Sequence, residues 1–176
     1  MIWSKPLPFA LKVAVCVFVM VAVSACRVSY KFTGTSIDYN VVKTIQIDNI
    51  PLRSAYVWAP MGPMFNNRLQ DLYANQTRLQ FVRRGGDLHI SGEIIGYEQY
   101  NKSISADGLS SQTQLKMTVN IRFVNNTDHK QDFERQFTAT TQYDSNQQLA
   151  NVQEDLVSEM VDDLTDQIFN ATVANW

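Results

Sequence analysis

Residues 115–123 alternate strictly between apolar and polar side chains, and this pattern constrains the fold of the chain most. The apolar positions are Leu115, Met117, Val119, Ile121 and Phe123, and the polar positions between them are Lys116, Thr118, Asn120 and Arg122. Successive side chains of a strand point to opposite faces of its sheet. The pattern therefore predicts a strand in a sheet that is buried on one face and polar on the other.

Four further segments carry strand patterns, at residues 41–50, 79–82, 87–99 and 133–143. Gly92 and Gly96 lie inside the third of these, and a glycine within a strand indicates a bulge or a close approach of two backbones. Residues 125–130 have the composition of a hairpin turn that joins the 115–123 strand to the 133–143 strand. Residues 83–86 are expected to form a turn and residues 100–111 a loop.

Two segments have the periodicity of amphipathic helices. The first begins near Met61, with Pro63 in its first turn, where the missing N–H costs nothing. Its apolar face comprises Met61, Phe65, Leu69, Leu72 and Tyr73. The second covers about residues 148–170, with an apolar stripe formed by Leu149, Val152, Leu156, Met160, Leu164 and Ile168. Its opposite face is acidic and is predicted to be a solvated surface.

The order of these elements is β-α-β-β-β-β-α, and each helix has an apolar stripe to bury. A helix and a sheet bury their apolar faces most simply against each other in two layers. We therefore predict an α+β two-layer sandwich, with two helices packed on one face of a four- to five-stranded, mostly antiparallel sheet. Residues 41–176 would form this single domain.

The first 25 residues have the features of a secretory signal. Lys5 and Lys12 precede an uncharged apolar stretch at residues 13–23, and Ser24 and Ala25 lead directly into Cys26. A cysteine after small residues resembles the lipobox of bacterial lipoproteins, so we expect removal of residues 1–25 and acylation of Cys26. An uncleaved membrane anchor is the alternative, but the stretch is shorter than the roughly 20 residues that span a bilayer. Residues 26–40 would then tether the domain to the lipid.

The remaining composition excludes several classes of protein. The only other cysteine is Cys16, within the predicted signal, so the domain would have no disulfide and would depend on packing alone. The formal net charge is −2, without a basic stripe, which argues against nucleic acid as a partner. His89 is expected to be a solvated strand residue and His129 a turn residue, and their spacing is not that of metal ligands. We find no motif for a catalytic residue, a cofactor or a metal, and expect a protein that is not an enzyme.

Several segments, in their order along the chain, resemble the LptE family of lipopolysaccharide-assembly lipoproteins. Besides Cys26, they are residues 43–47, 65–71, 76–79, 86–88, 92–97 and 168–170. The resemblance implies a two-helix, four-stranded sandwich inside a large β-barrel, LptD, which inserts lipopolysaccharide into the outer leaflet of the Gram-negative outer membrane. It implies an outer-membrane location, lipid-anchored, on the periplasmic side or in the barrel lumen. The partners would be the LptD-like barrel, lipopolysaccharide and the membrane.

Lipopolysaccharide carries phosphates, so exposed basic side chains are candidate contacts for it or for the barrel. Lys116 and Arg122 share one strand face, and Arg83 and Arg84 lie in a turn. Ordinary solubilising charge is the alternative for all four residues.

Two other functions remain open from the residues alone. One is an accessory or pilot lipoprotein of another envelope secretion or transport machine, which would differ in the partner it binds. The other is a lipid carrier, which needs an enclosed apolar pocket. The strict alternation of residues 115–123 predicts a single filled core instead.

Overall fold

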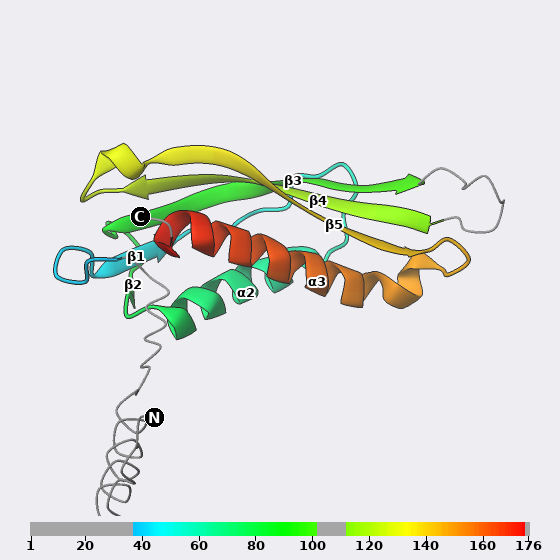
Figure 1. Ribbon diagram of the computed structural model, residues 1–176, viewed down its shortest axis with the longest axis horizontal. Helices are drawn as coiled ribbons and strands as arrows, with labels where there is room; N and C mark the ends of the chain where they lie inside the picture. Colours follow the sequence, from blue (N-terminus) through cyan, green and yellow to red (C-terminus); the bar gives the residue numbers. More distant parts are fainter. Residues whose placement is uncertain (1–36, 102–111, 175–176) are drawn as a thin grey trace, which may run out of the picture. The chain divides into compact units, whose positions relative to one another are not determined.

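The computed structural model describes residues 37–101 and 112–174. Its helices and strands are β1 (Thr44–Ile47), α2 (Met61–Gln76), β2 (Gln80–Phe81), β3 (Leu88–Asn101), β4 (Gln112–Asn125), β5 (Phe133–Asp144) and α3 (Leu149–Phe169) (Figure 1). A short 3-10 helix, His129–Gln131, lies in the hairpin between β4 and β5, and a π-helical turn, Asn170–Ala174, follows α3. The predicted signal, Cys26 and most of the predicted tether lie outside the described residues.

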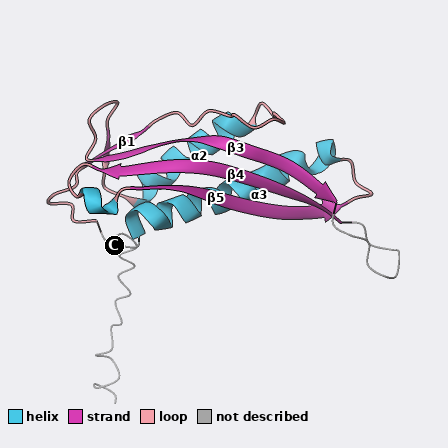
Figure 2. Ribbon diagram, turned by 90° about the horizontal axis from the view of Figure 1, so that it is seen from above, coloured by secondary structure: helices cyan, strands magenta, loops and turns pink. Residues whose placement is uncertain are grey.

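The five strands form one mixed sheet in the order β2-β1-β3-β4-β5. Strand β1 runs parallel to both β2 and β3, whereas β3, β4 and β5 are antiparallel. Both helices lie on the same face of this sheet, and Figure 2 looks onto its other face. The predicted fold class and element order are confirmed, with parallel pairing on both sides of β1 as a detail that the patterns did not specify.

The core fills the space between the sheet and the helices. All five apolar residues of the alternating segment in β4 are at most 1% exposed. Ile37 is also buried in this core, so the ordered domain includes residues just before position 41. Burying each side chain of this size contributes about 1.5–3 kcal/mol, so these five residues of β4 contribute strongly to the stability of the core.

Helix α2 begins at Met61 and buries the face that the sequence predicts. It also buries one polar side chain, Asn66. The segment after β1 contains Ile50, and the Asn66 side chain bonds the backbone N–H and C=O of Ile50 as a neighbouring strand would. Asn66 Oδ1 accepts a hydrogen bond from Ile50 N at 2.8 Å, and its Nδ2 donates to Ile50 O at 3.0 Å and to Gly62 O at 2.8 Å. The β1–α2 connection is therefore fixed to the second turn of the helix.

Helix α3 buries a stripe that differs at its N-terminal end from the predicted one. Leu149, Val152 and Leu156 are only half-buried, whereas Gln153 and Val157 are buried. The predicted residues follow one another mostly in steps of four, whereas an α-helix has 3.6 residues per turn. The predicted stripe therefore winds slowly around the helix, and its N-terminal residues turn away from the core. The two stripes coincide from Met160 onward.

The two glycines of β3 have the roles that were expected of them. A Cβ atom at Gly92 would lie 2.2 Å from the carbonyl oxygen of Asn120 on β4, so a side chain has no space there. Gly96 follows a register shift that begins at Ile94, where one extra residue of β3 is accommodated. This bulge reverses which face of the sheet odd-numbered and even-numbered residues occupy.

Candidate functional site

The face of the sheet opposite the helices carries almost only polar side chains. We call it the open sheet face, and it comprises Ser91, Glu93, Glu98, Gln114, Lys116, Thr118, Asn120, Arg122, Glu134, Gln136, Thr138, Thr140 and Gln142. These residues come from β3, β4 and β5, and no described element lies over them (Figure 2). Most are amides and hydroxyls, so the open sheet face can form many hydrogen bonds without a strong charge.

Lys116 and Arg122, two of the predicted contacts, both lie on the open sheet face. Lys116 is opposite Glu98 of β3, and Arg122 is opposite Glu134 of β5. They are six residues apart on one strand, which corresponds to roughly 20 Å. Each cation therefore has an acidic cross-strand neighbour, and the two do not form one concentrated anion site.

Arg83 and Arg84 are exposed in the turn that follows β2. Gly85, with a φ of 70°, supports the tight geometry of this turn. Strands β1 and β3 separate β2 from β4, a sideways distance of roughly 14 Å. The structure therefore does not bring the four predicted basic residues together, and their roles remain predictions, as does the lipidation of Cys26.

His89 lies on the outward face of β3, but it is not simply solvated as expected. Its Nε2 lies 2.8 Å from Asp48 Oδ2, and Gln46 Nε2 donates to Asp48 Oδ1 at 2.8 Å. The hydrogen bond from Gln46, together with the bond and charge of His89, lowers the pKa of the Asp48 carboxyl below its usual value. Sequence spacing missed this cluster because it depends on β1 lying beside β3.

The Asp87 carboxylate fixes the start of β3 to the start of β1. Its Oδ2 accepts hydrogen bonds from Lys43 N at 2.8 Å and from Thr44 N at 2.9 Å. The bond from the Lys43 backbone is the main reason that the pKa of Asp87 is lowered. Within the described ranges, no three His, Cys, Asp or Glu side chains lie close enough to hold a metal ion.

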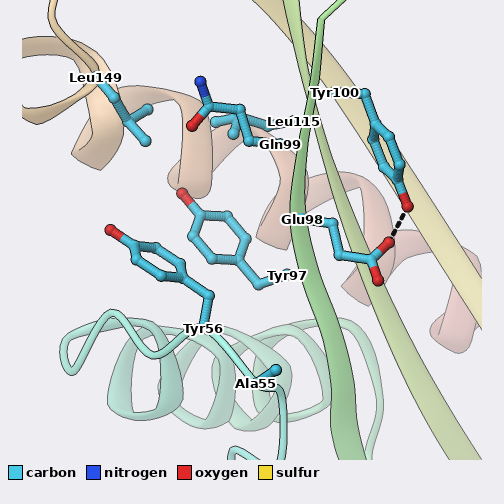
Figure 3. Close-up of a pocket in the computed structure, with 8 residues that line it drawn as sticks. All are labelled: Ala55, Tyr56, Tyr97, Glu98, Gln99, Tyr100, Leu115 and Leu149. Carbon is cyan, nitrogen blue, oxygen red and sulfur yellow. Dashed lines mark hydrogen bonds between the residues drawn. The ribbon is translucent and has the colours of Figure 1, made fainter.

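A cleft of about 520 Å³ lies at the opposite end of β3 from Asp87, beside the loop that follows Leu52 (Figure 3). Its walls include Tyr56, Tyr97 and Leu149, which approach from the loop, the sheet and the start of α3. The Tyr56 and Tyr97 rings stack with their centroids 5.5 Å apart, and Gln153 Nε2 donates to the Tyr97 hydroxyl at 3.0 Å. The cleft is open to solvent, so it is a surface feature at the end of the filled core.

These features define the class of fold: a two-layer α+β domain with a filled core and one polar sheet face that no described element covers. Among the described helices, none is both long and apolar enough to cross a membrane. The family model for LptE, described as lipopolysaccharide-assembly, matches residues 42–172, and the chain belongs to this family. The family consists of non-enzymatic outer-membrane lipoproteins of lipopolysaccharide assembly.

Several solved structures are similar to the chain at low sequence identity. A minor lipoprotein from Acinetobacter baumannii is 17% identical over 73% of this chain and 90% of its own, with a TM-score of 0.47. Rare lipoprotein B from Shewanella oneidensis is 19% identical over 72% and 92%, with a TM-score of 0.45.

Hypothetical protein CT253 from Chlamydia trachomatis is 9% identical over 72% of this chain and 93% of its own, with a TM-score of 0.50. This likeness shows a common fold alone. Among curated protein sequences, none matches the chain significantly.

Proposed function

We propose that the chain is the lipoprotein partner of a large LptD-like β-barrel in the outer membrane, and that it occupies the barrel lumen and assists the insertion of lipopolysaccharide. Membership of the LptE family supports the assembly role. The open sheet face is the observation that carries the proposed position inside a barrel. The lumen of a large outer-membrane barrel is polar, and a protein within it needs a polar surface.

The chemistry of the open sheet face suits such an enclosed position. Thr118, Asn120, Gln136 and Thr138 form its centre, and these neutral side chains can exchange hydrogen bonds with water for hydrogen bonds with the lumen. Moving a charged side chain from water into the lumen without a partner of opposite charge would cost several kcal/mol. A neutral polar surface therefore binds a polar wall at a lower desolvation cost than a strongly charged one.

Acylation of Cys26 would hold the domain at the periplasmic side of the outer membrane. Each buried methylene of an acyl chain contributes about 0.8 kcal/mol, so several chains on one residue anchor a protein firmly. The anchor would limit the search for the barrel to the plane of the membrane. Lys116 and Arg122 are the proposed contacts for lipopolysaccharide phosphates.

Depletion of the chain from its own bacterium tests this function. We expect lipopolysaccharide to fall at the cell surface, and the large barrel to lose its correct assembly, before other envelope systems are affected. Re-expression of the intact chain should restore both. Normal surface lipopolysaccharide together with failure of a secretin or a transporter would instead identify an accessory lipoprotein of another envelope machine.

A further inference from the structure

One part of β3 has a strand neighbour on one edge only. On the side of β1, pairing covers Leu88–Ile90, and a single bridge joins Leu52 to Ile94. On the other side, β4 pairs with β3 as far as Asn101. Within the described residues, positions 97–101 of β3 therefore form a free strand edge (Figures 1 and 2).

The backbone groups at this free edge can be assigned from the alternation of the strand. Ile90 and Ile94 face the helices and direct their backbone groups to the β1 side. Ile90 O accepts from Asp48 N at 2.9 Å, and Ile94 N donates to Pro51 O at 2.9 Å. After the bulge, Tyr97 and Gln99 face the helices, so their N–H and C=O groups point to the free edge.

The free edge opens into the 520 Å³ cleft (Figure 3). Tyr56, Tyr97 and Leu149 lie on the helix side of β3, whereas Glu98 and Tyr100 lie on its other side. An added strand would thus meet an apolar wall towards the helices and a polar wall towards the open sheet face.

Large apolar side chains are unusually exposed around this edge. Tyr56 is 53% exposed and Tyr100 45%, and both line the cleft. Soluble proteins commonly protect a strand edge with lysine, proline or a covering segment. Positions 97–101 contain no lysine and no proline, so the edge is well suited to pairing with another strand.

We propose that the free edge binds an extended segment of the barrel partner as an added β-strand. This inference rests on the proposed function, because the barrel supplies the occupant. Outer-membrane barrels carry long loops that can provide such a segment. Alternating N–H and C=O groups are complemented by another main chain and not by an acyl chain, which has no hydrogen-bonding groups.

The walls of the cleft specify the sequence of the segment. About five residues are needed to pair with positions 97–101, a length of roughly 16 Å. Side chains that point towards the helices should be apolar, since they would contact Tyr56, Tyr97 and Leu149. Those that point the other way should be polar or basic, since Glu98 is their neighbour.

Residue-resolved amide hydrogen exchange on the full lipidated chain, alone in mild detergent and in complex with the co-purified barrel, tests the proposal. We expect the amides of Tyr97 and Gln99 to exchange at least tenfold more slowly in the complex. The amides of Glu98 and Tyr100 point towards β4 and should change much less, which provides a control within the same strand.

A pair of variants separates the main chain from the side chain. Gln99→Pro removes the N–H at the free edge but none of the bonds to β4, whereas Gln99→Ala keeps the N–H. Both variants lose the bond from the Gln99 side chain to the Tyr143 hydroxyl. We expect the proline variant to dissociate from the barrel at least tenfold faster and the alanine variant to behave as the wild type.

Three results would overturn the proposal. An intact complex with unchanged exchange at Tyr97 and Gln99 would reject the added strand and leave the proposed function in place. Protection that grows with the concentration of the chain alone would show that a second copy pairs with the edge instead. Absence of any barrel complex would reject both the proposed function and this inference. If Gln99→Pro does not fold, the exchange experiment still decides.

Discussion

Asn66→Ala should destabilise the folded domain by about 3 kcal/mol, although it removes one small polar side chain. Asn66 supplies both backbone partners of Ile50, with contacts of 2.8 Å to its N and 3.0 Å to its O. Ile50 is 1% exposed, so water has little access to the groups that the substitution leaves without a partner. The segment between β1 and α2 would lose its attachment to the helix.

The magnitude follows from the two backbone groups. A buried donor or acceptor that loses its partner costs about 1–3 kcal/mol, and Ile50 has one of each. Partial relaxation of the loop reduces the sum, which gives about 3 kcal/mol. In a domain of this size, such a loss lowers the melting temperature by roughly 10 °C.

Urea unfolding of the full chain in mild detergent, followed by far-UV circular dichroism, measures this difference. Asn67→Ala is the matched control, because Asn67 is the next residue of α2 and is exposed. It should change stability by less than about 0.5 kcal/mol. Equal effects of the two substitutions, or an Asn66→Ala effect below about 1 kcal/mol, would refute the assigned role of Asn66.

Three further predictions concern the sheet and its charges. Gly92→Ala should cost about 3 kcal/mol in urea unfolding, since its Cβ would overlap the backbone of β4, whereas Gly62→Ala, which meets nothing within 4 Å, should be neutral or stabilising. A small effect at Gly92 would contradict the close strand approach. Because the pKa of Asp87 is lowered in the folded state, the ionised carboxylate stabilises the fold above about pH 4, and this stabilisation is lost as the pH falls through the lowered pKa. Asp87→Asn should therefore lower the free energy of unfolding at neutral pH, and the difference in stability between wild type and variant should shrink in acid. A pH-independent difference in urea midpoint would contradict this. Lys116→Glu combined with Arg122→Glu should weaken lipopolysaccharide binding several-fold in a direct binding assay at low salt, and unchanged binding would exclude both residues as contacts.

The sequence predicts those parts of the fold that depend on local periodicity. The alternation of 115–123 correctly assigns every buried residue of that segment, and the spacing from Met61 assigns the buried apolar face of α2. The alternation continues through the whole strand segment, and the helical spacing continues over more than three turns, so each pattern is long enough to predict its element. The predicted apolar stripe of α3 is partly wrong because its residues follow one another mostly in steps of four. An α-helix has 3.6 residues per turn, so residues spaced by four do not stay on one face over the whole length of the helix.

Features that depend on the order of the strands in the sheet could not be predicted from the local sequence patterns. The contact of His89 with Asp48 requires β1 beside β3, and the free edge at Tyr97 requires knowledge of where β1 stops. The four basic residues could be placed on a strand face or in a turn, but their separation follows only from the order β2-β1-β3-β4-β5. Local spacing contains no information on these distances.

Purification of the full-length, lipidated chain from its own envelope in mild detergent tests the central claim most directly. Co-purifying proteins would be identified and quantified by mass spectrometry. We expect one very large β-barrel, recovered in a fixed stoichiometric ratio with the chain. Recovery of a secretin or a transporter in its place, or of the chain alone, would contradict the proposed position inside an LptD-like barrel.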